Sequence, residues 1–178
     1  MAVLKDGVAE KIKGIKLVIF DVDGVLTDGR IIYGDDGKET KAFDVKDGHG
    51  IKLLMRAGIN SAIITARESR VVEHRGKNLG IELVYQGRKD KIEAFEDIKR
   101  KTGLKASEIA YVGDDIIDLP VIKRAGFSAA VSDAVQEVRE RVDYVSVRPG
   151  GRGAAREVAE LILKTQGKWD EILANYLK

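Results

Sequence analysis

The sequence predicts an α/β fold in which a parallel sheet is flanked by helices. Short apolar runs rich in β-branched and aromatic residues recur along the chain, and segments with helical spacing of apolar residues separate them. Strands that alternate with helices are joined by crossover connections, which produce parallel pairing. The 178 residues contain no repeat or linker that would divide them, so we expect one domain over residues 1–178.

The strands are predicted from six runs of residues that favour sheets. These are KLVIF (16–20), SAIIT (61–65), ELVY (82–85), IAYVG (109–113), FSAAV (127–131) and DYVSV (143–147). The helices are predicted from apolar residues three or four positions apart. This pattern occurs at 51–55 before Gly58, 92–98 before Gly103, 135–142, 154–163 before Gly167, and 169–173.

One segment departs from this alternation, at about residues 29–43. It reads RIIY, then GDDG, then KETKAF, which is typical of two short strands joined by a polar turn. The elements together therefore predict a Rossmann-like sheet with a protruding β-hairpin.

Composition excludes several classes of function. The chain has no cysteine, which removes disulfides, thiolate catalysis and cysteine-bound zinc. Lys and Arg number 31 against 29 Asp and Glu, with no basic block, so nucleic acid is not an expected partner. No apolar run approaches the roughly 20 residues of a membrane span, and the first residues lack the pattern of a secretory signal. We expect a cytoplasmic protein.

Polar side chains occur where the predicted strands end. Asp21 and Asp23 follow the first strand, Thr65 ends the second, and Asp114 follows the fourth. Lys91 lies at the start of the helix after the third strand. Ligands of parallel α/β sheets bind beyond the carboxyl ends of the strands, so these side chains should meet in one crevice.

These residue types favour phosphoryl transfer. Clustered carboxylates need a cation, and Mg²⁺ is the ion that suits oxygen ligands beside a phosphate. Thr65 and Lys91 could contact phosphoryl oxygens and offset their charge. Asp21, ionised beside the metal, would attack phosphorus, while Asp23 would protonate the leaving oxygen and later activate water. Acids after a strand are also common as plain turns or helix caps, so only the combination favours catalysis.

Four segments resemble the signature motifs of the haloacid dehalogenase superfamily of phosphatases, in order and in spacing. They are FDVDGVLTDG, IITAR, the lysine of KDKIEAF, and VGDDIID. Members of this superfamily usually carry a cap domain inserted between motifs. Here only 41 residues, 24–64, separate Asp23 from Thr65, and a hairpin and one helix already occupy them. We therefore expect no cap domain.

The resemblance extends to one branch of that superfamily. GDDGKETKAFDVKDGHGIKLL, LGIELVYQG and GGRGAAREVAELIL resemble the 3-deoxy-D-manno-octulosonate 8-phosphate phosphatases and their relatives that act on nine-carbon sialic-type sugar phosphates. This resemblance implies hydrolysis of the eight-carbon sugar phosphate to the free sugar acid used in lipopolysaccharide. It also implies a homotetramer in which the hairpins form a central barrel and each active site is bordered by a neighbouring subunit.

Residue roles follow from the same resemblance. It implies that Asp21, the backbone carbonyl of Asp23, and Asp114 bind Mg²⁺, and that Asp118 orients Lys91 or a metal-bound water. Whether Asp115 or Asp118 itself contacts the metal stays open, as does the role of Arg152. The residues expected to face the substrate are Asp23, Asp44, Val45, Lys46, Asp47, Gly48, Lys52, Arg67, Arg75 and Lys91.

Three rival functions remain. A phosphatase of a nine-carbon sialic-type 9-phosphate would share every motif named above. A phosphoaspartate receiver would also use acids, Mg²⁺, a hydroxyl and a lysine, but its aspartate would end a middle strand and no acid would stand where Asp23 does. An inactive scaffold would keep the fold and release no phosphate.

Overall fold

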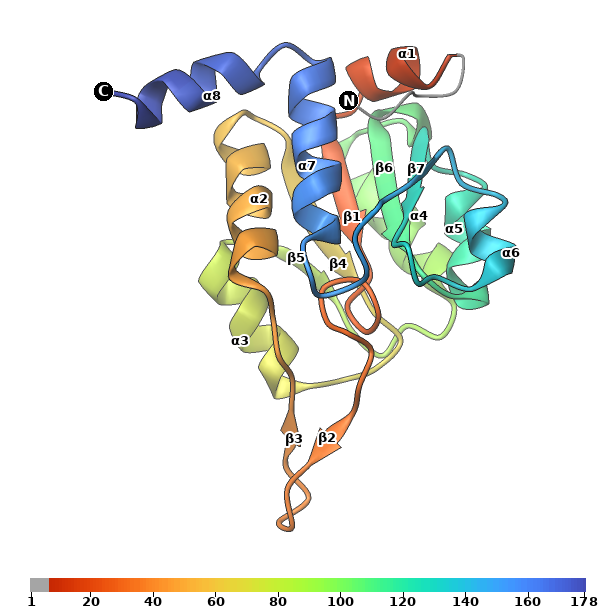
Figure 1. Ribbon diagram of the computed structural model, residues 1–178. Coiled ribbons are helices and arrows are strands. Elements are labelled where there is room, and N and C mark those ends of the chain that lie inside the picture. The colour runs from red at the N-terminus through yellow and green to blue at the C-terminus, as the bar shows by residue number, and fades with distance from the viewer. Residues whose placement is uncertain (1–6) are drawn as a thin grey trace.

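The structure is a computed structural model that describes residues 7–178. Its main sheet has six strands in the order β5-β4-β1-β6-β7-β8, and every neighbouring pair is parallel (Figure 1). The strands are β1 Leu17–Phe20, β4 Asn60–Ile64, β5 Leu83–Tyr85, β6 Ile109–Gly113, β7 Phe127–Ala130 and β8 Tyr144–Val145. Five of the six predicted runs contain one of these strands, and the run at 61–65 overlaps β4, which begins one residue earlier. The predicted α/β architecture is confirmed.

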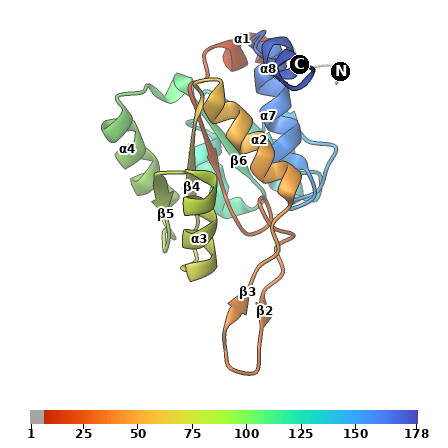
Figure 2. The ribbon, with the colours of Figure 1, turned by 90° about the vertical axis from the view of Figure 1, so that its left-hand side faces the viewer.

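Helices cover both faces of the sheet. α2 and α7 pack against each other on one face, and α4 lies on the other (Figure 2). The helices are α1 Val8–Lys13, α2 Val45–Arg56, α3 Arg70–Leu79, α4 Lys91–Thr102, α5 Leu119–Ile122, α6 Gln136–Arg139, α7 Ala154–Thr165 and α8 Trp169–Tyr176. The sheet is thus shielded from water on both sides, as a parallel sheet requires.

Four helical segments differ from the sequence-based prediction. α1, α3 and the single turn α5 were not predicted, and the helix expected over 135–142 is only the single turn α6. α3 is strongly charged and buries only Val72, Gly76 and Leu79, which leaves a weak apolar pattern. In the 135–142 segment, burial of Val138 and Val142 does not need a continuous helix.

The central strand β1 positions the crevice. Its four residues are buried, and Ile19 lies opposite Ala62 of β4 and Tyr111 of β6. The chain leaves β1 toward β4 and β5, then crosses back to β6 on the other side of β1. Such a reversal opens a crevice between the loops at the carboxyl ends of the two strands, β1 and β6.

Two helix starts near this crevice are capped by aspartates. The Asp44 carboxylate accepts hydrogen bonds from the backbone N–H groups of Lys46 and Asp47, at 2.6 and 3.3 Å. Asp90 accepts from the N–H of Ile92 at 2.9 Å. Caps of this kind satisfy otherwise unpaired donors in the first helical turn, which fixes where α2 and α4 begin.

The predicted hairpin is present and projects away from the sheet (Figure 1). It consists of β2 Ile32–Tyr33 and β3 Glu39–Thr40, which pair antiparallel, and Gly37 takes a positive φ of 74° in the turn. Each strand has only two residues, so the hairpin makes little sheet of its own. The side chains of Ile32 and Tyr33 are exposed.

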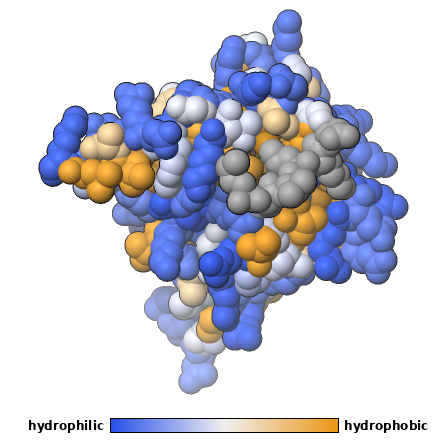
Figure 3. Space-filling view, turned by 45° about the horizontal axis from the view of Figure 1, so that its top comes forward, coloured by the Kyte–Doolittle hydropathy of each residue, from blue (hydrophilic) through white to orange (hydrophobic). Residues whose placement is uncertain are grey.

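At the opposite end from the hairpin, α8 packs on α7 and leaves apolar residues in solvent (Figure 1, Figure 3). Leu173 and Leu177 are among the exposed large apolar residues. Over residues 7–178, none of the helices has the length and apolar character needed to cross a membrane.

Candidate active site

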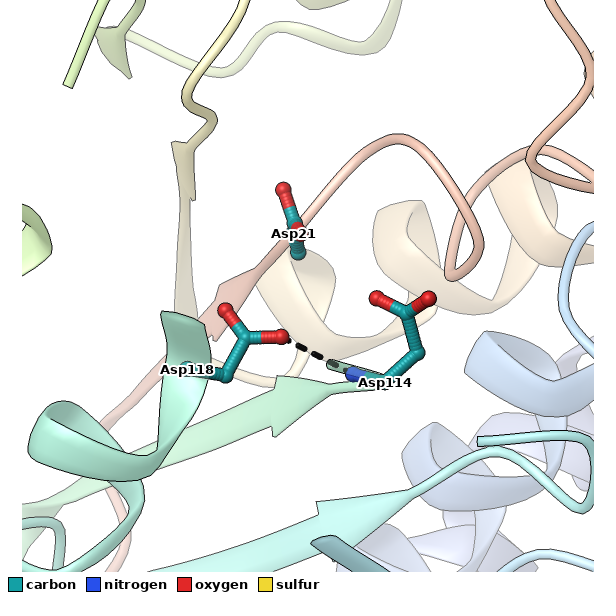
Figure 4. A group of neighbouring side chains, drawn as sticks. All are labelled: Asp21, Asp114 and Asp118. Carbon is teal, nitrogen blue, oxygen red and sulfur yellow. Dashed lines mark hydrogen bonds between the residues drawn. The ribbon is translucent and has the colours of Figure 1, made fainter. Parts of the chain in front are cut away.

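Three carboxylates meet beyond the ends of β1 and β6. Asp21 directly follows β1, Asp114 directly follows β6, and Asp118 ends the short 3-10 helix Ile116–Asp118. Each offers an oxygen within 4.8 Å of the other two, and Figure 4 shows the three side chains side by side. The sequence predicted that Asp21 and Asp114 converge, and the geometry of the parallel sheet brings them together.

Lys91, the first residue of α4, supplies the positive charge between these acids. Its side chain is fully buried, and its Nζ lies 2.7 Å from Asp21 Oδ2 and 2.6 Å from Asp118 Oδ1. Burial lowers the pKa of the Lys91 ammonium, but Asp21 and Asp118 outweigh it and leave that pKa above its usual 10.5. Lys91 is therefore a fixed cation beside Asp21.

Asp118 organises the site rather than offering a free ligand. Besides Lys91, its Oδ1 accepts from the Tyr111 hydroxyl at 2.6 Å, and its Oδ2 accepts from the backbone N–H of Asp115 at 3.2 Å. The same Oδ2 accepts from the backbone N–H of Asp114 at 2.9 Å (Figure 4). Four donors fill the acceptor positions of this carboxylate. Its contact with Lys91 is the one that an orienting role for Asp118 would use.

Asp21 and Asp114 are less fully compensated than Asp118, although Asp21 has Lys91 and the backbone N–H of Val22, both at 2.7 Å. Burial raises the pKa of Asp21 from 3.8 to about 7, against the opposing effect of Lys91. Burial and the neighbouring charges of Asp21 and Asp118 raise the pKa of Asp114 from 3.8 to about 8. The two carboxylates thus resist being ionised together, and a cation would remove that resistance.

The donor set fits a hard divalent ion. Asp114 Oδ1 is buried and has no hydrogen-bond partner among residues 7–178, although buried polar atoms are nearly always paired. Gly24, at φ 89°, keeps this space open, because a Cβ there would lie 2.0 Å from Asp114 Oδ2. Carboxylate oxygens are the ligands that Mg²⁺ prefers, so Asp21 and Asp114 could hold it.

Asp23 lies in a different environment, formed by the base of the hairpin. Its Oδ1 contacts the buried ammonium of Lys41, and Arg67 Nε lies 3.9 Å from its Oδ2. Lys41 also contacts Glu39 at 2.8 Å, and Arg67 Nη2 donates to the Tyr33 hydroxyl at 3.1 Å. The two aspartates of the first loop therefore have different partners, Lys91 for Asp21 and Lys41 for Asp23.

Thr65 directly follows β4 and is buried. Its backbone N–H donates to the backbone carbonyl of Tyr85 at 2.9 Å, and its own carbonyl accepts from the backbone N–H of Arg88 at 3.0 Å. These bonds fix the backbone at the carboxyl end of β4, the strand next to β1. The sequence predicted the Thr65 hydroxyl at this edge of the sheet.

The segment expected to face the substrate divides into exposed and buried residues. Val45 and Lys46 are exposed, whereas Asp47 and Gly48 are buried. The Asp47 carboxylate accepts from the backbone N–H groups of Gly153 and Arg156, at 3.1 and 2.8 Å. Asp47 thus joins α2 to the start of α7, and its side chain is already occupied.

Two cations expected to bind substrate, Arg75 and Lys52, lie around this segment, as does Arg152, whose role the sequence left open. Arg75 donates to the Asp44 carbonyl at 3.1 Å, with its guanidinium 5.2 Å from the ring centre of Phe43. Lys52, half-buried on α2, makes no ion pair with the described residues. Arg152 lines a separate groove of about 550 Å³ together with Lys46 and Arg148.

Sequence reasoning missed Lys41, Glu39 and Tyr111. The KETKAF segment reads as an ordinary polar hairpin strand, and nothing in it indicates that the Lys41 side chain is buried. Tyr111 reads as a core residue of its strand. Only the folded arrangement places its hydroxyl on Asp118.

Comparisons with known proteins agree with this geometry. The model of the haloacid dehalogenase-like hydrolase family matches residues 83–155. The 3-deoxy-D-manno-octulosonate 8-phosphate phosphatase KdsC of Escherichia coli K12 is 49% identical over 164 residues, covering 92% of this chain and 87% of the relative. The corresponding enzyme of Yersinia pestis is 44% identical over 163 residues, with the same coverage of 92% and 87%.

Solved structures give the same result. The Moraxella catarrhalis 3-deoxy-D-manno-octulosonate 8-phosphate phosphatase, in complex with magnesium ion, phosphate ion and KDO, has a TM-score of 0.93 and 46% identity, covering 95% of this chain and 97% of that one. A probable YrbI family phosphatase from Pseudomonas syringae has a TM-score of 0.95 and 45% identity, covering 98% and 99%. On its sequence and its fold, the chain belongs to the 3-deoxy-D-manno-octulosonate 8-phosphate phosphatase family of haloacid dehalogenase-like hydrolases.

Proposed function

We propose that this protein is a magnesium-dependent phosphatase that hydrolyses 3-deoxy-D-manno-octulosonate 8-phosphate to the free sugar acid, for lipopolysaccharide synthesis. The main support is the buried group of Asp21, Asp114 and Lys91, whose charges suit a metal and a phosphate. Relatives 44% to 49% identical carry this activity in their names, and one neighbour was solved with magnesium, phosphate and the sugar acid.

Mg²⁺ would be held by the carboxylates of Asp21 and Asp114 and by the backbone carbonyl of Asp23. The unpartnered Oδ1 of Asp114 supports this assignment. When bound, the ion neutralises charge on the phosphoryl group and on the two acids. Asp118, with four donors of its own, keeps Lys91 and the backbone of Asp114 and Asp115 in place.

The reaction would proceed in two steps. Asp21 attacks phosphorus, and the bond between phosphorus and the sugar oxygen breaks as an aspartyl phosphate forms. Asp23 gives its proton to the departing oxygen. Asp23 then takes a proton from water, which attacks phosphorus and releases phosphate from Asp21. Lys91 and the Thr65 hydroxyl stabilise the phosphoryl oxygens in both steps.

The sugar acid would be recognised beside these groups. We assign contacts to the exposed parts of the Asp44–Gly48 segment and to Lys52, Arg67 and Arg75, because guanidinium and ammonium groups suit a carboxylate and a phosphate. The occupied carboxylate of Asp47 supports a positioning role for that residue and its neighbour Gly48.

A homotetramer would complete the site. With no cap domain, the crevice needs another cover to exclude water. The hairpin leaves Ile32 and Tyr33 exposed at 49% and 60%, and Tyr33 contacts Arg67 beside Asp23, so a second copy packed on the hairpin would border the site. Light scattering should give four subunits for the native chain and fewer for Ile32→Asp; a monomeric native chain would rule this out.

The decisive test measures phosphate release from a panel of sugar phosphates with and without Mg²⁺. We expect the eight-carbon substrate to be turned over in preference to hexose phosphates, only with the metal, not by Asp21→Asn, and at least about 100-fold more slowly by Asp23→Asn. Higher kcat/KM for a nine-carbon sialic-type 9-phosphate would reassign the substrate. A stable phosphoprotein without turnover would indicate a receiver, and no reaction in any arm would indicate a scaffold.

A further inference from the structure

Lys41 is a buried cation at the base of the hairpin, and the reaction described above gives it no role. Its side chain is fully buried, yet it lies in a segment whose neighbours are largely exposed. An isolated ammonium group is costly to bury, so such a lysine needs close anionic partners. Two carboxylates meet this need, Asp23 and Glu39.

The two partners of Lys41 come from different parts of the chain. Glu39 belongs to β3, and its Oε1 lies 2.8 Å from Lys41 Nζ. Asp23 belongs to the loop after β1, and its Oδ1 contacts the same nitrogen. The ammonium therefore fastens the Asp23 loop to the hairpin.

The contact also orients the Asp23 carboxylate. With Oδ1 on Lys41, the other oxygen, Oδ2, has Arg67 as its one cationic partner within the described part of the chain, at 3.9 Å, which is too long for a hydrogen bond. Oδ2 is thus the oxygen available to exchange a proton with substrate or water. General acid–base catalysis requires that oxygen to lie within hydrogen-bond reach of its partner.

We propose that Lys41 is a positioning residue for Asp23, holding one carboxylate oxygen so that the other is presented to the leaving group and then to water. The inference rests on the proposed phosphatase function. Lys41 itself touches neither substrate nor metal. It acts by fixing the Asp23 side chain, and Glu39 holds Lys41 from the hairpin side.

The leaving group provides the test. A sugar alkoxide needs a proton as it departs, whereas p-nitrophenolate hardly does, so loss of the acid slows only the first kind of substrate strongly. General acid–base catalysis contributes about 100-fold to 10,000-fold. In Lys41→Met we expect kcat/KM for the eight-carbon sugar phosphate to fall by about 10-fold to 100-fold, with kcat/KM for p-nitrophenyl phosphate within about 3-fold. We compare kcat/KM because it reports the steps up to departure of the leaving group, whereas the later attack of water is common to both substrates. The ratio of the two rates is the readout, because misfolding would lower both equally.

Three variants sharpen the result. Lys41→Arg keeps a cation on Asp23 and should recover most of the native ratio. Lys13→Met removes an exposed lysine paired with Glu10 and should leave the ratio unchanged. In an Asp23→Asn background, Lys41→Met should change the ratio no further, as expected of residues that act as one unit.

Failure of this inference differs from failure of the proposed function. If the native chain does not hydrolyse the sugar phosphate, the proposed function is wrong. If it does, but Lys41→Met slows both substrates equally, or slows the Asp23→Asn variant by a further similar factor, Lys41 has no positioning role and only supports the hairpin.

Discussion

The stability of the metal-free protein should fall as the pH rises from 6 to 8. Asp21 and Asp114 have pKa values raised to about 7 and about 8 by burial, so the folded protein holds protons that the unfolded chain has already released above pH 4 to 5. Each such proton makes the free energy of unfolding fall by about 1.4 kcal/mol per pH unit until the folded group ionises. Over this interval the two groups together give a loss of about 4 kcal/mol.

Thermal unfolding measures this directly. For a domain of this size, about 4 kcal/mol corresponds to a drop in Tm of roughly 8 to 16 °C. Mg²⁺ binds the ionised carboxylates, so saturating Mg²⁺ should raise Tm far more at pH 8 than at pH 6. Protein concentration is kept constant throughout. Asp114→Asn removes one of the two groups, so the Tm measured without metal should depend less on pH. A metal-free Tm equal at pH 6 and pH 8, or an effect of Mg²⁺ that does not vary with pH, would refute the reasoning.

Three further predictions concern single side chains. Gly24→Ala puts a methyl group 2.0 Å from Asp114 Oδ2, so calorimetry should show at least about 10-fold weaker Mg²⁺ binding; unchanged affinity would contradict the assigned site. Asp118→Asn weakens the hold on Lys91 and should lower kcat by about 10-fold to 100-fold with little change in KM, whereas a rise in KM alone would argue against it. Asp47→Ala removes the acceptor for two N–H groups at the start of α7 and should cost about 2 kcal/mol in urea unfolding; a native midpoint would contradict this role.

The catalytic centre was predictable because its parts depend on simple rules of parallel sheets. Asp21, Asp114 and Thr65 each follow or end an apolar run, and the carboxyl ends of such runs lie at one edge whatever the details of packing. Lys91 could be placed because it begins a helix at the same edge. Predicting where these residues lie requires only the strand order and the direction of the chain.

Lys41 and α3 were not predictable in the same way. Burial of Lys41 depends on Glu39 and Asp23 arriving from two other segments, and no local pattern encodes such a meeting. α3 rests on the protein with three buried residues among ten, so its apolar face is too sparse to stand out. The positions of both follow from tertiary contacts rather than from periodicity.

Asp21 is held by the main sheet, whereas Asp23 is held by the hairpin. The backbone N–H of Asp21 donates to the carbonyl of Val112 at 3.0 Å, at the end of β1. Because β1 is hydrogen-bonded to a strand on each side, its amide hydrogens should exchange slowest. Asp23 is tied through Lys41 to a hairpin with two-residue strands, where exchange should be fast. The proposed nucleophile is thus held by the centre of the main sheet, whereas the proposed proton donor is held through Lys41 by a hairpin with few backbone hydrogen bonds.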